Sequence, residues 1–427
     1  MNTLQEIYQA YLQSSGVATD TRQIKESSIF FALKGDNFNG NTYAAQAIEK
    51  GAAYVVVDDP AYAQSNCFLV EDVLSCLQQL AKHHRENLTI PFLGLTGSNG
   101  KTTTKELIAQ VLGSKYNVAF TQGNLNNHIG VPLTLLAIRK EHDIAIIEMG
   151  ANHKKEIEFL CKICQPNYGY ITNFGKAHLE GFGGFEGVIA GKTELYHFLK
   201  KTMGHVFINA SDPLQLEHGI GIEQITFSTD TRPGDFTITQ QEESKATSTL
   251  SVRFEKNTIH SQLTGQYNLS NMAAAIAIGS YFKVPVKQIK HSLETYVPEN
   301  NRSQIAKTKQ NELIIDAYNA NPSSMEQALL NFEQFPATAK WCILGDMFEL
   351  GQYECEEHLK IVQQADSMNF EQVILVGKAF YQCENKGISF EKTQDLLDFL
   401  SSNQPINKTI LLKGSRGMRL EKAIPLL

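Results

Sequence analysis

The sequence contains little of what marks a secreted or membrane protein. Its seven cysteines are an odd number scattered from Cys67 to Cys383, which fits a reducing compartment and does not suggest a framework of structural disulfides. No apolar run is long enough to span a bilayer, and the N-terminus (Met1-Asn-Thr-Leu-Gln-Glu) lacks the basic start and apolar core of a secretory signal. We therefore expect a cytoplasmic protein with no segment inserted into a membrane.

Positive charge is also in deficit. Lysine and arginine number 38 against 45 acidic residues, which gives a formal net charge of −7. This balance predicts neither a nucleic-acid partner nor binding to a membrane surface, so local groups must bind any anionic ligand. The chain is expected to act as a monomer.

The chain is long enough for about three domains. Its 427 residues are 42% hydrophobic and 19% charged, and apolar strands alternate with helix-patterned segments, which predicts an α/β fold. The predicted domains are a small N-terminal α/β domain (1–87), a central domain with a mostly parallel sheet (88–300) and a C-terminal Rossmann-like domain (301–427). Predicted strands span 28–33, 54–57, 92–95, 143–147, 168–172, 313–316, 341–345, 373–377 and 410–413, predicted helices span 42–50, 72–84, 187–196 and 272–278, and 240–248 is a predicted hairpin loop.

The strongest motif lies at residues 90–106. An apolar strand runs into a loop with Gly97 and Gly100 and then into a helix-patterned segment, which is the order of a phosphate-binding loop. Glycines let the backbone N–H groups turn towards an anion, and the helix directs its positive end at the same point. Lys101 would reach the outer phosphates and Thr102 a magnesium ion. The loop is a variant, because Leu95 stands where the general pattern has glycine.

Three polar residues follow the loop at strand ends or on a helix. Glu148 ends one predicted strand, His178 follows another, and Lys192 lies on the helix at 187–196. Each alone reads as an ordinary surface residue. Because ligands collect at the carboxyl ends of parallel strands, we expect the three to join the phosphate loop in one site.

Two further patterns have competing readings. Asn268 and Asn271 precede the predicted helix at 272–278, and helix capping accounts for one of them only. Cys161 and Cys164 form a single C-x-x-C on an apolar helix face. With no second pair of this kind, core packing is predicted in preference to zinc binding or redox chemistry.

The segment Thr96-Gly-Ser-Asn-Gly-Lys-Thr-Thr resembles the phosphate loop of the Mur ligases, the ATP-dependent amino-acid-adding enzymes of peptidoglycan precursor synthesis, and the resemblance runs through all three domains. Within that family the chain is similar to the members that join D-Ala-D-Ala to UDP-MurNAc-tripeptide, and it lacks the Asp-Asn-Pro-Arg of the preceding ligase. The other motifs that carry this resemblance are Gln122-Gly-Asn-Leu-Asn-Asn, Glu148-Met-Gly-Ala-Asn, Tyr318-Asn-Ala-Asn-Pro-Ser-Ser-Met, Asp346-Met-Phe-Glu-Leu-Gly and Lys413-Gly-Ser-Arg-Gly-Met-Arg.

The resemblance implies ligation through an acyl phosphate, giving UDP-MurNAc-pentapeptide, ADP and phosphate. Thr102 and Glu148 would hold one magnesium ion, and His178 with a carbamate on Lys192 a second. The implied catalytic residues are Lys101, His178, Lys192 and Arg302. The implied ATP-binding residues are Gly97, Ser98, Asn99, Gly100, Lys101, Thr102 and Thr103, with Asn268 and Asn271 near adenine, Arg302 on phosphate and Asp316 on ribose.

The implied substrate residues lie on all three domains, so domain closure must assemble the site. Thr21, Arg22 and Lys34 would hold the uridine nucleotide. The muramoyl-peptide arm would meet Asn126 and Asn127, and the C-terminal domain would add Asn319 and Asn321.

The chain departs from the family pattern at three positions. Lys155 stands where glycine is common, and Tyr267 and Asn41 stand where histidine is frequent. Two other functions stay open. A folylpolyglutamate-type ligase shares the loop and the carbamate but resembles only the last two domains, and a nucleotide-dependent switch would hydrolyse ATP without ligating anything.

Overall fold

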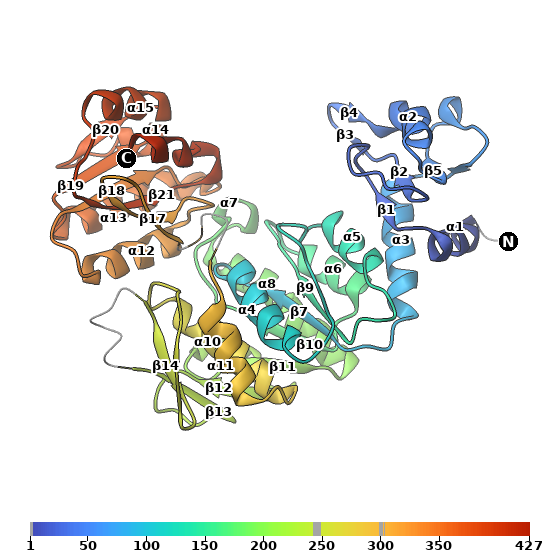
Figure 1. Ribbon diagram of the computed structural model, residues 1–427, viewed down its shortest axis with the longest axis horizontal. Helices are drawn as coiled ribbons and strands as arrows, with labels where there is room; N and C mark the ends of the chain where they lie inside the picture. Colours follow the sequence, from blue (N-terminus) through green and yellow to red (C-terminus); the bar gives the residue numbers. More distant parts are fainter. Residues whose placement is uncertain (1–2, 242–248, 299–301, 303) are drawn as a thin grey trace.

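The structure is a computed structural model that describes residues 3–241, 249–298, 302 and 304–427. Its strands form three sheets and one short hairpin, and Figure 1 shows the sheets as separate bodies along the chain. This arrangement confirms the predicted α/β fold with three domains. No helix in these ranges is long and apolar enough to cross a membrane.

The first sheet is parallel and has the order β1-β2-β5-β6. The next helix, α3, begins after Asp72, whose carboxylate accepts a 2.6 Å hydrogen bond from the Ser75 N–H and so caps the helix. The elements of this body are α1 (Thr3–Gln13), β1 (Val17–Ala18), β2 (Ile29–Phe31), the hairpin β3 (Lys34–Gly35) and β4 (Phe38–Asn39), α2 (Ala44–Glu49), β5 (Tyr54–Val57), β6 (Cys67–Leu69) and α3 (Val73–Glu86).

The central sheet has nine strands in the order β15-β14-β13-β12-β11-β10-β7-β9-β8. It is parallel from β8 to β13, as predicted, and ends in the antiparallel strands β14 and β15. The strands are β7 (Phe92–Thr96), β8 (Val118–Phe120), β9 (Ile144–Glu148), β10 (Tyr168–Ile171), β11 (His205–Asn209), β12 (Glu223–Ser228), β13 (Phe236–Gln240), β14 (Ser251–Phe254) and β15 (Asn257–His260).

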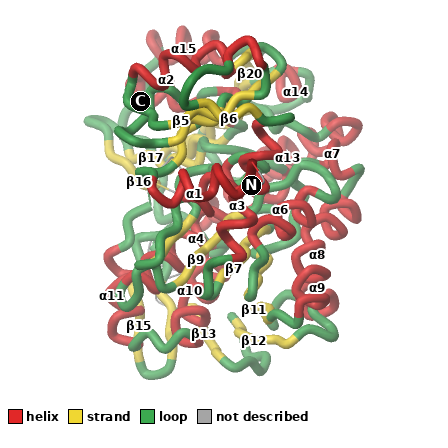
Figure 2. Tube along the Cα trace, turned by 90° about the vertical axis from the view of Figure 1, so that its right-hand side faces the viewer, coloured by secondary structure: helices red, strands yellow, loops and turns green. Residues whose placement is uncertain are grey.

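Helices cover both faces of the central sheet, which explains why β7 and β9 are buried along their whole length and read as continuous apolar runs. Figure 2 shows α4, α10 and α11 on one side of the strands and α6 and α8 on the other. The central helices are α4 (Lys101–Gly113), α5 (Gly130–Leu136), α6 (Glu156–Cys164), α7 (Leu179–Phe182), α8 (Phe185–Thr202), α9 (Pro213–His218), α10 (Asn268–Tyr281) and α11 (Val286–Thr295).

The third sheet has the order β16-β17-β21-β18-β19-β20 and is parallel except for its edge strand β16. Helices cover it as in a Rossmann-like fold. Its elements are β16 (Gln304–Lys307), β17 (Glu312–Asp316), α12 (Pro322–Gln334), β18 (Lys340–Gly345), α13 (Glu354–Ser367), β19 (Gln372–Val376), α14 (Lys378–Tyr381), β20 (Ile388–Phe390), α15 (Thr393–Ser402) and β21 (Thr409–Lys413).

Two local predictions need correction or fall outside the described residues. The helix predicted at 272–278 begins four residues earlier, because α10 starts at Asn268. The predicted loop at 240–248 cannot be compared beyond its ends, since residues 242–248 lie outside the described ranges.

Candidate active site

The phosphate loop joins β7 to α4, and its two glycines are required by space and by backbone angle. Gly97 has φ +143°, and an added Cβ would lie 2.0 Å from the Thr172 hydroxyl oxygen. Gly100 has φ +75°, and a Cβ there would lie 2.7 Å from Oδ1 of Asn271. A side chain at either position would therefore displace a residue that supports the loop.

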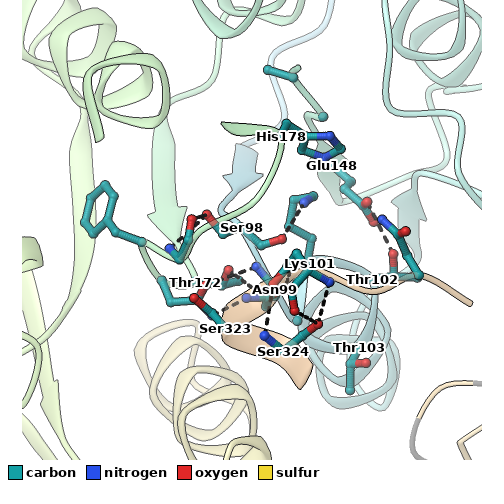
Figure 3. A pocket seen from close by; sticks show the side chains of 18 of the residues that line it. Ser98, Asn99, Lys101, Thr102, Thr103, Glu148, Thr172, His178, Ser323 and Ser324 are labelled. Atoms are coloured by element: carbon teal, nitrogen blue, oxygen red, sulfur yellow. Dashed lines mark hydrogen bonds between the residues drawn. The ribbon is translucent and has the colours of Figure 1, made fainter. Parts of the chain in front are cut away.

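The loop after β10 braces the phosphate loop from the side (Figure 3). Asn173 Oδ1 accepts a 3.0 Å hydrogen bond from the Asn99 N–H, and the Thr172 hydroxyl donates to the Asn99 carbonyl at 2.6 Å. Ser98 Oγ donates to the Gly175 carbonyl at 2.9 Å. With these bonds made, the N–H groups of the first turn of α4 remain as donors for an anion.

The phosphate loop opens into a cavity of about 1120 Å³ between the central and C-terminal domains. Its wall includes Ala151, Asn173, Tyr318 and Lys413, which we did not predict as site residues. The predicted residues in its lining are Ser98, Asn99, Gly100, Lys101, Thr102, Thr103, Asn126, Asn127, Glu148, His178, Asn268, Asn271, Arg302, Asp316, Asn319 and Asn321.

Two cations converge on the loop side of this cavity. Lys101 Nζ donates to the Gly97 carbonyl at 2.8 Å and to the Ser98 carbonyl at 3.3 Å. Desolvation lowers the pKa of Lys101; the negative charge of Glu148 opposes this shift, and the positive charge of Arg302 adds to it. The Nε of Arg302 is buried without a hydrogen-bond partner. A phosphate bound between these two cations would offset their mutual repulsion.

Glu148 presents a carboxylate oxygen without a hydrogen-bond donor. Its side chain is 1% exposed, and Oε1 accepts from the Asn126 amide at 2.8 Å and from the Thr102 hydroxyl at 3.3 Å. Oε2 has no hydrogen-bond partner and lies 3.5 Å from Nζ of the buried Lys105. A buried carboxylate oxygen that accepts no hydrogen bond and lies beside a threonine hydroxyl fits a magnesium ion.

The described part of the chain contains no group of three or more His, Cys, Asp or Glu placed to hold a metal. The expected magnesium residues, Thr102 and Glu148, include one carboxylate, and magnesium in a nucleotide site takes one or two carboxylates and completes its shell with phosphate oxygens and water.

Lys192 is fully buried on α8, and its side chain contacts Ala151, a residue of the cavity wall. Its Nζ donates to the Ala151 carbonyl at 3.1 Å and lies 4.9 Å from the centre of the Phe182 ring. Desolvation lowers the pKa of Lys192 well below its usual value, and the charge of Lys101 acts in the same direction. The amine is therefore held towards its neutral, nucleophilic form.

His178 meets the C-terminal domain across the cavity. Its Nδ1 pairs with the carboxylate of Glu349, and the Glu180 N–H donates to the Glu349 carbonyl at 3.1 Å. No contact joins His178 to Lys192 among the interactions of the described residues. The predicted second metal pair is thus near one cavity without being in direct contact.

Asn268 and Asn271 brace the phosphate loop and do not cap α10. Thr104 Oγ1 donates to Asn271 Oδ1 at 2.9 Å, the Asn271 amide donates to Asn268 Oδ1 at 2.8 Å, and the Asn268 amide donates to the Thr264 carbonyl at 2.7 Å. The preceding residue, Tyr267, makes no side-chain cap either. The capping interpretation of one asparagine is therefore wrong.

Asn321 bonds the C-terminal domain directly to the central domain. The Asn321 amide donates to Asn99 Oδ1 at 2.7 Å, while its Oδ1 caps α12 by accepting from the Ser324 N–H. Asp316 forms a 2.5 Å ion pair with Lys413, and Asn319 is exposed. Lys176 joins the same interface through a 2.7 Å ion pair with Glu357.

The three predicted uridine-side residues lie elsewhere. Thr21, Arg22 and Lys34 belong to the N-terminal domain and do not line the cavity. Arg22 pairs with Asp20 at 2.6 Å and Lys34 with Asp58 at 2.7 Å. The structure therefore brings together the central and C-terminal residues and leaves the N-terminal set apart.

Some residues that build the site were missed by sequence reasoning. The only sequence feature that marked Lys105 was its position one helical turn after Lys101. Glu349 and Lys413 lay inside motifs already noted, but no pattern indicated which domain faces each would meet.

The C-x-x-C pair is part of the core, as predicted. Cys161 and Cys164 are buried on α6, and their sulfurs lie 3.9 and 3.7 Å from the sulfur of Met149. Burial raises the pKa of the Cys164 thiol to about 12 and that of Cys161 well above its usual value. Both thiols are therefore held in the unreactive, protonated form.

Lys155 is strained, and replacing it with glycine should stabilise the protein. It precedes α6 with φ +71°, and its N–H donates to Glu194 Oε1 at 2.5 Å. A left-handed backbone costs a side chain about 1 kcal/mol. We expect Lys155→Gly to raise the melting temperature by about 1 to 2 °C in a thermal unfolding scan. Lys155→Ala, which keeps the Cβ, is the control, and an equal rise there would mean that the lysine charge causes the strain.

Comparison with known proteins matches three family models to the chain. The Mur ligase family catalytic domain matches residues 13–85, the Mur ligase middle domain 95–279, and the Mur ligase glutamate ligase domain 301–416. Each match falls on one of the three sheets.

Curated relatives match over nearly the whole chain. The UDP-N-acetylmuramoyl-tripeptide--D-alanyl-D-alanine ligase of Bacillus subtilis is 36% identical over 96% of this chain and 92% of its own length. The enzyme of the same name from Escherichia coli is 32% identical over 98% and 95%. A crystal structure of MurF from Acinetobacter baumannii superposes with a TM-score of 0.86 at 29% identity, covering 98% of this chain and 97% of that one. With every domain matched in order, this chain belongs to the Mur ligase family.

Proposed function

We propose that the protein is an ATP-dependent ligase that joins D-Ala-D-Ala to UDP-MurNAc-tripeptide and forms UDP-MurNAc-pentapeptide, ADP and phosphate. The observation that carries this proposal is that Lys101, Arg302 and the carboxylate of Glu148 line one cavity at the phosphate loop. The names of the full-length relatives support the choice of substrates. The domain limits 1–87, 88–300 and 301–427 and a cytoplasmic location are part of the same proposal.

The first step moves the γ-phosphoryl group of ATP to the terminal carboxylate of the tripeptide. The bond from the terminal phosphorus to the bridging oxygen breaks, a bond to a carboxylate oxygen forms, and ADP leaves. Lys101 and the first-turn N–H groups of α4 bind the outer phosphates, and Arg302 offsets the charge on the transferred group. The resulting acyl phosphate has a good leaving group, which the carboxylate lacked.

The second step forms the amide. The neutral amine of D-Ala-D-Ala attacks the acyl carbon through a tetrahedral oxyanion. The C–O bond to phosphate breaks, phosphate leaves with the bonding electrons, and the attacking nitrogen loses one proton to the departing phosphate or to water. The C-terminal domain presents the amine, because its strand ends face the phosphate loop across the cavity. Asn99 and Asn321 hold the two domains in register during the attack.

Magnesium, when bound, supplies a positive charge between the phosphate oxygens, and Thr102 and Glu148 are the residues that would hold it. His178 and a carbamate on Lys192 would hold a second ion. The neutral amine of Lys192 can attack carbon dioxide and lose a proton, which gives a carbamate anion with oxygen atoms that could bind a metal ion. Asn268 and Asn271 would face adenine, and Asp316 the ribose.

The substrate roles complete the proposal. Asn126 and Asn127 would meet the muramoyl-peptide arm, and Asn319 and Asn321 the C-terminal side of the substrates. Thr21, Arg22 and Lys34 would bind the uridine nucleotide after the N-terminal domain moves towards the cavity.

Phosphate release tests the proposal. With UDP-MurNAc-tripeptide and ATP, release should require D-Ala-D-Ala and should not occur with L-Ala-L-Ala. Release that needs a folate and glutamate instead would identify a folylpolyglutamate-type ligase, a reading already disfavoured by the match over residues 13–85. Release that is indifferent to every acceptor would leave the nucleotide switch as the function.

A further inference from the structure

An exposed arginine on the C-terminal side of the cavity has no role in the site described above. Arg416 lies in the turn after β21, three residues beyond Lys413, and its Nη1 donates to the Tyr318 hydroxyl at 3.4 Å. Its guanidinium carbon lies 5.3 Å from the centre of the Tyr318 ring. Tyr318 lines the cavity, so Arg416 stands at the rim behind a wall residue.

The backbone that carries Arg416 is held firmly. Ser415 is buried, its N–H donates to the Asp346 carbonyl at 3.1 Å, and its Oγ accepts from the Phe348 N–H at 3.0 Å. The Phe348 ring covers Gly417 so closely that a Cβ there would lie 2.6 Å from it. A guanidinium on such a turn is positioned by the fold and loses less freedom when it binds an anion.

Arg416 has no acidic partner within the described ranges, whereas its neighbour Lys413 is neutralised by Asp316 at 2.5 Å. The other guanidinium on Tyr318 is that of Arg302, 3.7 Å from the ring centre. Arg302 lines the same cavity as Lys101 and the phosphate loop, and we therefore assign it to the phosphate side. The Tyr318 ring thus contacts two guanidinium groups, one assigned to phosphate and one without an acidic partner in the described part of the chain.

The amine substrate of the proposed reaction brings such an anion. A dipeptide has a free carboxylate at the end opposite its reacting amine, and this carboxylate would be repelled by the triphosphate unless a cation met it. The two ring distances limit the separation of the guanidinium carbons to about 9 Å. An extended dipeptide spans about 7 Å, which is within this limit, so a dipeptide whose amine lies beside Arg302 can place its carboxylate within reach of Arg416.

We propose that Arg416 binds the terminal carboxylate of the dipeptide and makes the enzyme specific for an amine substrate that ends in a free acid. The inference rests on the proposed function. Arginine suits the task because its planar fork pairs with both oxygens of a carboxylate.

The test is a double-mutant-type cycle with two substrates and two enzymes. Because the two substrates are compared on the same enzyme, a general loss of activity in the variant does not change the ratio of their kcat/KM values. D-Ala-D-Ala and its C-terminal amide are assayed with the wild type and with Arg416→Met. For the wild type, kcat/KM should be about ten- to a hundredfold higher for the acid than for the amide, as for the loss of one charged hydrogen-bonded pair. For Arg416→Met the ratio should fall to about one, while the KM for ATP stays within twofold.

Two variants complete the experiment. Arg416→Lys should restore part of the preference for the acid, since it returns the charge without the fork. Lys422→Met, an exposed lysine in the same C-terminal segment, should leave the wild-type ratio unchanged.

The negative results are distinguishable. A wild-type ratio that survives in Arg416→Met, or a wild type that uses acid and amide equally, overturns the role of Arg416 while ligation itself stands. A wild type that ligates neither dipeptide overturns the proposed function and this inference together.

Discussion

Lys101→Ala should lower kcat for phosphate release about a thousandfold, with unchanged thermal stability. The ammonium of Lys101 is the cation at the start of α4, and charge that develops on the transferred phosphoryl group depends on such preorganised groups. The folded state should not suffer, because burial already lowers the pKa of Lys101 and removing a desolvated cation relieves that cost.

The measurement is phosphate release at saturating substrates, with a melting scan on the same sample. Lys162→Ala is the matched control, since Lys162 pairs with Glu158 on the exposed face of α6 and is 62% exposed. A Lys101→Ala enzyme with near wild-type kcat would contradict the placement of the triphosphate at this loop.

Lys192→Ala should lose about 99% of the activity, and added bicarbonate should not restore it. The side chain is fully buried with a strongly lowered pKa, so its amine is available for carbon dioxide, and alanine has no atom on which a carbamate can form. Loss of a metal-supporting group typically costs one to two orders of magnitude.

A second readout separates chemistry from packing. Wild-type protein in ¹³C-bicarbonate should show a carbamate carbon resonance that Lys192→Ala lacks. Lys192→Met keeps most of the buried stem, so it should be inactive yet at least as stable as the wild type. Full activity in either variant would refute the carbamate.

The fold was predictable where long apolar patterns set it. Strands β7 and β9 are continuous apolar runs because helices cover both of their faces. The start of helix α3 was also predictable, because Asp72 is a typical N-cap residue and does cap that helix. Strands of two or three residues, such as β1 and β6, have no period to detect and owe their pairing to neighbours. The start of α10 was placed too late, since polar residues in its first turn concealed the helical pattern.

The site was predictable as a set of residue types and not as a set of contacts. Glycines at 97 and 100 follow from the backbone angles that a phosphate loop needs, and they were found. The pairing of Lys105 with Glu148 and that of Asn99 with Asn321 join residues far apart in sequence. No local pattern specifies such a pair, because it depends on how the sheets and domains are placed in space.

The hydrogen bond from Asn321 to Asn99 links the phosphate loop of the central domain to the N-cap of α12 in the C-terminal domain. A rotation of the C-terminal domain that opens the cavity must break this tether or drag the loop with it. Exchange of the nucleotide and release of the peptide product would then both require this hydrogen bond to break. ADP would therefore leave most readily when the product leaves.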